Sequence, residues 1–176
     1  MMSETKNKIF ASDFIYNKLL YNDKVTFLKV NKLFKKNNYN KFNIIFLRHV
    51  LEHIIDFDVL IPKLKKLLNK DGIIIIEVPN YNSFWKKVLL GYWPGYFYPF
   101  HYYVFSKSFL IRRLKKHHLK ITKIKHVEPP IFGSFFSSLG VNRSLSKLFS
   151  IFLYPLQFII SKFTFSSEGI LFILKK

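Results

Sequence analysis

Two histidines lie where their side chains could carry out acid–base chemistry, and one of them follows a glutamate. Glu52 and His53 directly follow the apolar run 44–47, whose length suits a buried strand rather than a helix. His101 lies in the aromatic-rich segment 92–105. A neutral imidazole can exchange a proton near pH 7, so we predict that His53 and His101 are catalytic residues that contact a substrate or act as its base. The alternative is structural: Glu52 and His53 organise the turn, and His101 packs within an aromatic lid.

Thiol and metal chemistry are not expected. The sequence has no cysteine, which excludes disulfides, thiolate zinc sites and cysteine nucleophiles. No set of His, Asp and Glu residues shows a spacing typical of a metal site, so we predict no metal. The polar N-terminus, residues 1–8, lacks the apolar core of a signal peptide, and we expect a cytoplasmic protein.

The elements that must position these residues begin with two strongly apolar runs, 44–47 and 73–78, joined by an amphipathic helix. Asp56 or Asp58 can cap this helix, and Gly72, in a left-handed conformation, can end it. Runs this apolar are typical of parallel strands covered on both faces. We therefore predict that 44–47 and 73–78 are neighbouring parallel central strands.

Weaker patterns complete the prediction. Alternating strands and helices indicate an α/β fold, and 176 residues suit a single domain, 1–176. Ser106 is expected to cap a late helix. The other predicted elements are a strand at 8–14 with a helical stretch to about residue 21, and strands at 25–30, 120–127 and 169–174.

Three segments, in this order, resemble class I S-adenosylmethionine-dependent methyltransferases. Residues 42–53, FNIIFLRHVLEH, resemble an F-D-x-I strand followed by H-V-L-E-H. Residues 67–80 resemble the L-L-K-P-G-G turn and the strand ending E-V-P-N. Residues 99–106, PFHYYVFS, resemble the P-x-H-x-x-x-F-(S/T) element of one branch of the family. Together they make the chain similar to this family over roughly residues 40–127.

The resemblance implies a Rossmann-like, mainly parallel sheet with flanking helices, its last strand antiparallel, and S-adenosylmethionine over the carboxyl ends of the strands. It implies cofactor-binding roles for Asp13 at the ribose, Asn31 near the adenine, His49 along the methionine part, and Glu52. The alternative for Asp13 is a helix cap. The acceptor implied for the methyl group is a small molecule, a sugar or a lipid-linked compound.

One family feature has no counterpart. Relatives carry a glycine-rich turn, roughly D-x-G-x-G-x-G, after their first strand, whereas the first glycine here is Gly72. If Asp13 ends the second strand of the family, the first strand would lie upstream of Met1. We therefore expect an N-terminally truncated domain, incomplete at its N-terminal side. Re-pairing or a partner chain must complete its sheet, or the chain is unstable alone. Binding of S-adenosylmethionine by this chain alone should be weak or absent.

Residues 128–168 are predicted to form a hydrophobic helical insertion before the last strand. The 14 residues 148–161 carry no charge and include Pro155. As a helix they reach roughly 21 Å, short of a bilayer core of about 30 Å, so we do not expect a transmembrane span. Two roles remain open: a helix lying on an anionic membrane surface, or a cover over the acceptor pocket or sheet edge.

The net charge of +19 favours anionic partners, although lysine also accumulates on solvated helix faces in a sequence this rich in Lys, Asn, Ile, Phe and Tyr. The sequence contains no recognisable nucleic-acid recognition element, so nucleic acid is not the expected partner. The competing function is a non-catalytic remnant that acts as an interaction or membrane-surface module.

Overall fold

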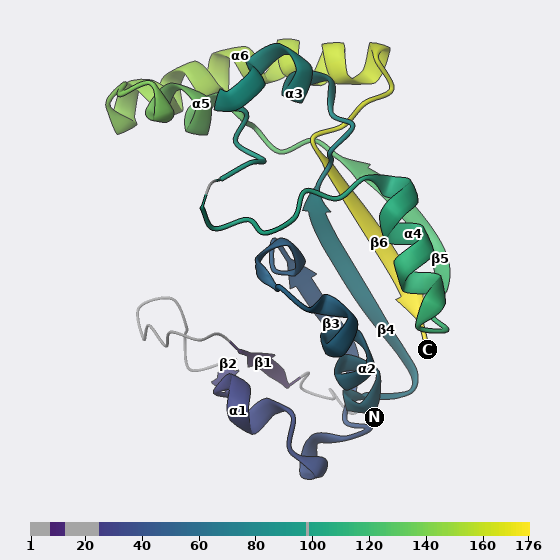
Figure 1. Cartoon of the computed structure of the whole chain (residues 1–176). Helices are drawn as coiled ribbons and strands as arrows, with labels where there is room; N and C mark the ends of the chain where they lie inside the picture. Colours follow the sequence, from purple (N-terminus) through teal and green to yellow (C-terminus); the bar gives the residue numbers. More distant parts are fainter. Residues whose placement is uncertain (1–7, 13–24, 98) are drawn as a thin grey trace, which may run out of the picture.

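The fold, obtained as a computed structural model, contains two separate sheets (Figure 1). The structure describes residues 8–12, 25–97 and 99–176. A two-stranded sheet is formed by β1 (Ile9–Ala11) and β2 (Val25–Phe27), and a four-stranded sheet has the order β3-β4-β6-β5. The strands of the larger sheet are β3 (Phe42–Arg48), β4 (Leu68–Pro79), β5 (Lys120–Val127) and β6 (Gly169–Lys175).

The prediction of two neighbouring parallel strands is confirmed for β3 and β4. Ile44 pairs with Ile73 and Leu47 with Ile76 in a parallel ladder. Helix α2 (Phe57–Leu67) joins the strands, and Asp56 caps it by accepting a hydrogen bond from the Val59 N–H at 3.2 Å. The position of β3 differs from the prediction, because within the described part of the chain it lies at the edge of the sheet.

The larger sheet is mixed rather than mainly parallel. Strand β6 lies between β4 and β5 and runs antiparallel to both. The last strand is therefore antiparallel, as the family resemblance implied. Because β6 pairs with both β4 and β5, two of the three strand pairs in this sheet are antiparallel.

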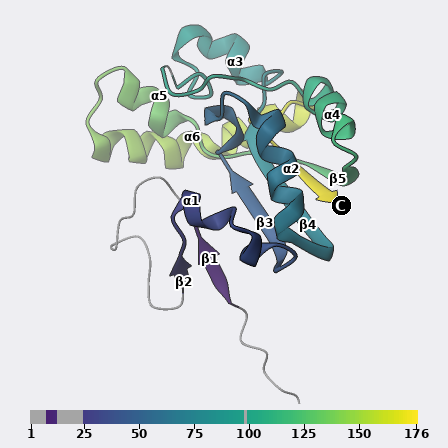
Figure 2. The ribbon, with the colours of Figure 1, turned by 60° about the horizontal axis from the view of Figure 1, so that its bottom comes forward.

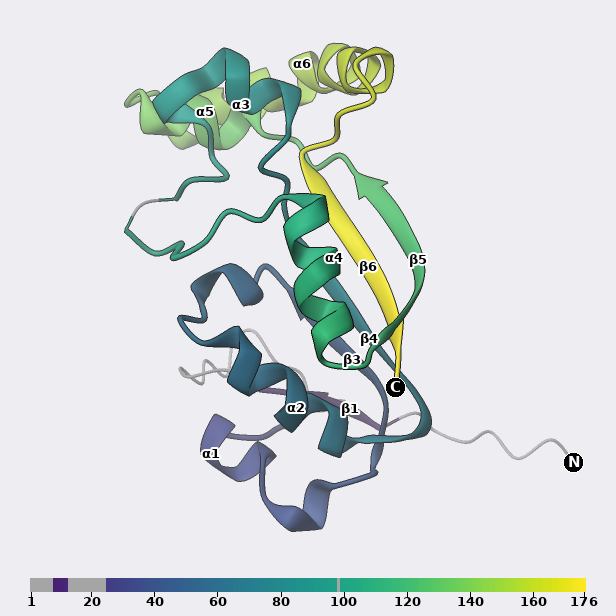
Figure 3. The same cartoon turned by 45° about the vertical axis from the view of Figure 1, so that its right-hand side comes forward.

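Only one face of this sheet is covered by helices in the described part of the chain. Helices α2 and α4 (Lys107–Lys116) lie on the same face (Figures 1 and 3), and Ser106 caps α4 as predicted. On this face Ile74 and Ile76 are fully buried. Alternate side chains point the other way, and Ile44 and Phe46 are 58% and 53% exposed. The prediction that both faces of β3 and β4 are covered was therefore wrong for these residues.

Gly72 does not end the helix in a left-handed conformation, because α2 ends at Leu67 and Gly72 lies within β4. A Cβ atom at Gly72 would lie 2.8 Å from Leu68 Cδ2 and 3.0 Å from the Phe42 backbone oxygen. Glycine is needed here because β4 passes closely beside the start of β3.

The β1–β2 pair forms a sheet of its own beside α1 (Val30–Leu33), as Figure 2 shows, and the ring of Phe10 in β1 lies 5.5 Å from that of Phe42 in β3. The two strands pair in parallel. Short 3-10 helices occur at η2 (Lys36–Asn38), η3 (Leu51–His53) and η4 (Leu90–Tyr92).

The predicted insertion forms most of a helical layer beyond one end of the larger sheet (Figure 1). It contains α5 (Phe132–Ser138) and α6 (Arg143–Phe163), which pack with α3 (Phe84–Leu89) around Trp85, Trp93 and Phe132. Helix α6 continues through Pro155, so its 21 residues reach about 32 Å, longer than the uncharged run indicated.

Candidate active site at the end of β3

The turn after β3 and the aromatic segment meet through the backbone of Glu52. Its carbonyl oxygen accepts hydrogen bonds from the N–H groups of Tyr102 at 2.9 Å and Tyr103 at 3.3 Å. The Tyr103 hydroxyl donates to the Ile55 carbonyl oxygen at 2.7 Å. These contacts bring His53 and His101, from two separate motifs, into one site.

Backbone carbonyl oxygens orient both imidazole rings. His53 Nδ1 lies 3.0 Å from the Phe100 oxygen, and His101 Nδ1 lies 2.8 Å from the Gly95 oxygen. A carbonyl oxygen only accepts hydrogen bonds, so each Nδ1 carries a proton, and in the neutral ring Nε2 is the nitrogen with the free electron pair. The ring centroids lie 4.6 Å apart.

The Glu52 carboxylate lies at the centre of this group and is fully buried. Its Oε1 atom is 3.2 Å from His49 Nδ1 and 4.0 Å from His101 Nε2. Its Oε2 atom has no hydrogen-bond partner among the described residues. A buried carboxylate oxygen normally has a partner, so this oxygen is a potential ligand-binding atom.

His49 connects Glu52 to a second buried carboxylate, Glu77, at the end of β4. Its Nε2 atom lies 3.6 Å from Glu77 Oε1, and its backbone N–H donates to the Glu77 carbonyl oxygen at 3.0 Å. The hydrogen bond to Glu52 raises the pKa of His49, partly opposed by burial and reinforced by the negative charges of Glu52 and Glu77. His49 itself adopts a left-handed conformation with φ of 49°, which turns the chain away from the sheet.

His101 has the opposite electrostatic character. Burial lowers the pKa of His101, and the hydrogen bond to Gly95 and the charge of Glu52 only partly oppose this effect. The neutral ring that results can accept a proton through Nε2.

The other predicted site residues are placed differently. His49, Glu52, His53 and His101 lie together, whereas Asn31 is an exposed residue of α1 and makes no contact with them in the described structure. Asp13 and the helical stretch to about residue 21 lie outside the described residues.

Glu77 was not predicted as a site residue. Its position at the end of the apolar run 73–78 could have indicated a site residue. The carboxyl ends of neighbouring parallel strands meet at one edge of a sheet, so Glu77 was bound to lie near the residues that follow the run 44–47.

A cavity of about 680 Å³ lies between α5, α6 and the segment after α3, and its lining includes none of Glu52, His53 and His101. The ring of Phe97, which lines the cavity, lies 5.5 Å from the ring of His101. The lining combines aromatic rings with two cations, and includes Tyr92, Trp93, Tyr96, Phe97, Arg143 and Lys147.

The residues present fit only part of an S-adenosylmethionine site. His49 and the buried glutamates lie at the carboxyl ends of β3 and β4, where ligands bind in open α/β sheets. The first 71 residues, however, contain no glycine that would let the backbone approach a cofactor closely. Among the described residues, β3 has no neighbouring strand on one side, and β1 and β2 form a sheet of their own, which agrees with this partial fit.

The chain matches a methyltransferase domain family over residues 5–124. No curated protein matches it in sequence. Among solved structures, it is similar to a SAM-dependent methyltransferase from Archaeoglobus fulgidus, with 14% identity and a TM-score of 0.60 over 95% of this chain and 75% of the other.

Other similar structures include 1,6-didemethyltoxoflavin-N1-methyltransferase from Burkholderia thailandensis, with 12% identity and a TM-score of 0.56 over 96% of this chain and 61% of the other. An S-adenosylmethionine-dependent methyltransferase from Mesorhizobium loti shows 8% identity and a TM-score of 0.53 over 95% of this chain and 79% of the other. The chain thus spans between 61% and 79% of these three structures. From the family match, the chain belongs to the class I S-adenosylmethionine-dependent methyltransferases.

Proposed function

We propose that the chain is a methyl-transfer domain for a small-molecule or lipid-linked acceptor. We further propose that it binds its cofactor weakly by itself, and that α6 binds the domain to the surface of an anionic membrane. The observation that carries the catalytic part is the meeting of His101, His53 and Glu52, with the ring of Phe97 between His101 and an aromatic cavity. The family's cofactor supplies an electrophilic methyl group. The residues of this chain orient the acceptor.

The acceptor side is supported by the state of His101. Its ring is nearly buried, with 8% of the side chain exposed, and Nδ1 is fixed by the Gly95 carbonyl. Nε2 is then available to accept a proton from an acceptor hydroxyl or amine. The cavity offers rings for an apolar portion and Arg143 and Lys147 for a negatively charged group, a combination that suits a lipid-linked or anionic acceptor.

Weak cofactor binding is inferred from the absence of glycine before Gly72. In dinucleotide-type folds a glycine-rich turn and the amides of the following helix bind the cofactor closely. Without those contacts, the carboxyl ends of β3 and β4 offer only the side of the site formed by His49 and Glu77.

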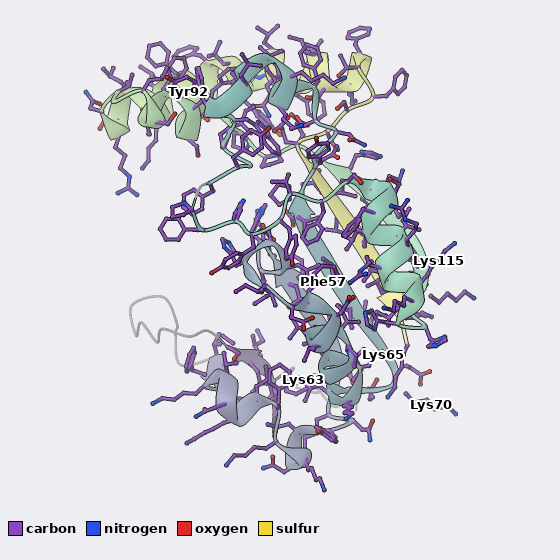
Figure 4. All side chains as sticks on the ribbon, viewed as in Figure 1. Phe57, Lys63, Lys65, Lys70, Tyr92 and Lys115 are labelled. Atoms are coloured by element: carbon purple, nitrogen blue, oxygen red, sulfur yellow. The ribbon has the colours of Figure 1, made fainter. Side chains whose placement is uncertain are left out.

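Membrane docking is supported by the orientation of α6, whose polar side faces the protein. Ser146, Gln157 and Ser161 are buried, whereas Ile151 and Phe152 are 70% and 71% exposed. Helices of water-soluble proteins have the reverse arrangement. Figure 4 shows the side chains of α6 projecting away from the sheet. The exposed large apolar residues of α6 are Leu145, Leu148, Phe149, Ile151, Phe152, Leu156, Phe158, Ile159 and Phe163.

A position on the membrane surface is favoured over a crossing, although α6 is long and apolar enough to span a bilayer. Its buried side is bonded to the rest of the domain: Gln157 accepts from the Ile131 N–H at 3.1 Å and donates to Glu128 at 2.6 Å. Ser161 accepts from Trp85 Nε1 at 3.1 Å and donates to Glu128 at 2.8 Å. A membrane crossing would break these bonds and expose polar groups to lipid.

A second candidate function, a non-catalytic membrane-surface module, is favoured by the same exposed face of α6. Both candidate functions predict membrane binding, and only the first predicts methyl transfer. Transfer of a tritium-labelled methyl group from S-adenosylmethionine separates them, with a free sugar, a lipid-linked sugar and a quinol as probe acceptors on phosphatidylglycerol vesicles.

Methyl transfer should occur to one acceptor class and rise with cofactor concentration into the millimolar range. His101→Ala should reduce the rate about 100-fold, a usual effect of losing a general base, whereas His118→Asn, an exposed histidine elsewhere, should not. Absence of transfer to every probe, with folding verified, would favour the non-catalytic module. Equal rates for both variants would contradict the role of His101.

A further inference from the structure

We propose that Glu52, His53 and His101 together bind one Zn²⁺ ion where η3 meets the aromatic segment. One donor atom from each of the three residues lies within 4.8 Å of the others. The residues come from two separate segments, which the Glu52 carbonyl bonds to Tyr102 and Tyr103 hold together.

Both histidine rings have the backbone hydrogen bond that is typical of metal-ligating histidines. Ligating histidines characteristically donate one ring N–H to a carbonyl or carboxylate, which fixes the tautomer and directs the other nitrogen at the ion. His53 does so through the Phe100 carbonyl and His101 through the Gly95 carbonyl. Both Nε2 electron pairs are therefore available.

The Glu52 carboxylate provides an independent indication of a cation. The residue is fully buried, and Oε2 has no partner in the described structure. Leaving a carboxylate oxygen desolvated without a partner costs free energy, which a bound cation would offset. Oε1 is held by His49 at 3.2 Å, so the carboxylate orientation is fixed before any ion binds.

Two imidazoles and one carboxylate are a donor set that suits Zn²⁺ and leaves a fourth position open. Zinc–nitrogen distances of about 2.0–2.1 Å place ligand atoms of a tetrahedral site roughly 3.4 Å apart, so each donor would move inward by less than about 1 Å. An acceptor oxygen in the open position would be bound by the ion, which would lower the pKa of its hydroxyl. The ion would then activate the acceptor in place of His101 Nε2, which becomes a ligand. This role rests on the proposed methyl transfer, whereas binding of the ion does not.

The sequence alone predicted no metal because spacing along the chain does not connect His101 with Glu52 and His53. The proposed site replaces that prediction. His49 serves as a positioning residue, since it holds Glu52 Oε1 and lies outside the triad of donors.

Isothermal titration of Zn²⁺ into the full chain, freed of any affinity tag and treated with chelator, tests the site. One equivalent should bind, and His53→Ala and His101→Ala should each weaken binding by about 100-fold or more. Glu52→Gln, which preserves volume, should have a similar effect. His118→Asn is the matched control and should bind like the parent, because Asn tolerates the left-handed conformation at that position, φ 54°.

Co²⁺ provides a second measurement that depends on ligand geometry. The parent should show the intense visible absorption of a four-coordinate site, which His101→Ala should abolish while its circular dichroism remains that of the folded chain. Equal Zn²⁺ affinity in the parent and the three ligand variants would overturn the proposal, and so would no binding by folded parent. No cofactor or acceptor is present in either measurement, so these failures leave the methyl-transfer proposal untouched.

Discussion

The imidazole rings of His53 and His101 lie 4.6 Å apart, although the residues belong to different segments of the chain. Each ring is anchored by a carbonyl of the aromatic segment, Phe100 for His53 and Gly95 for His101. The geometry of the site therefore depends on the docking of this segment on Glu52.

The buried carboxyl group of Glu168 should make stability depend on pH. Burial raises its pKa from 4.5 to about 7, despite hydrogen bonds from Ser83 and from Trp93 Nε1 at 2.6 Å. Because the folded pKa is raised, the folded state binds more protons than the unfolded state between these values. The contribution of Glu168 is thus complete below about pH 4.5 and is lost as pH rises through 7, on the order of 3 kcal/mol.

Urea unfolding of the parent and of Glu168→Gln between pH 5 and 8 checks this expectation. The amide stays neutral, so the variant should gain stability relative to the parent as pH rises. The pH dependence that other titrating groups contribute is common to parent and variant, so it cancels in the difference between their free energies of unfolding. Two parallel curves would show that Glu168 does not titrate in this range.

The close passage of β4 at Gly72 predicts a specific loss of stability. Gly72→Ala places a methyl group 3.0 Å from the Phe42 backbone oxygen, which cannot move without disturbing β3. We expect a loss of about 1–3 kcal/mol in the free energy of unfolding, the usual range for overpacking. Gly91→Ala is the control, since its Cβ would meet nothing within 4 Å, and its change should stay within about 0.5 kcal/mol. Equal unfolding midpoints would contradict the structure at this point.

Replacing exposed residues of α6 should weaken binding to anionic vesicles. The double variant Ile151→Ser, Phe152→Ser removes two side chains that are 70% and 71% exposed, and should lower vesicle affinity roughly 100-fold in co-sedimentation. The matched control is Ile55→Ser, Val59→Ser, which removes two exposed apolar side chains outside α6 and should bind normally.

Salt and lipid composition separate the modes of membrane contact. Lys162, and Arg143 and Lys147 when no acceptor occupies the cavity, should each add about 1 kcal/mol near an anionic surface. High salt or zwitterionic lipid should therefore weaken binding. Vesicle binding that changes with neither salt concentration nor lipid charge would contradict the proposed electrostatic contribution. Resistance to alkaline carbonate extraction would show that α6 crosses the bilayer instead.

The sequence predicted the centre of the fold well because its signals there are local. The apolar runs that became β3 and β4, the Asp56 cap and the Ser106 cap each depend on neighbouring residues. The role of Gly72 was mispredicted because a glycine after a helix suggests a cap, whereas the actual constraint is contact with Phe42, far away in sequence.

The candidate site was predictable only in part. Glu52, His53 and His101 were identified by their motifs, but the contact between them depends on backbone bonds from Tyr102 and Tyr103 that no spacing encodes. The orientation of α6 could not be predicted from the sequence either. Its composition left open a buried cover or a membrane surface, and only the structure shows that the polar residues face inward.

Calorimetric titration of S-adenosylmethionine into the folded chain tests the central claim, a methyltransferase domain that binds its cofactor weakly by itself. Without a glycine before Gly72, we expect a dissociation constant weaker than about 100 µM, or no measurable heat. Cooperative urea unfolding of the same sample serves to verify folding. Saturable binding with a dissociation constant in the low micromolar range would contradict the account.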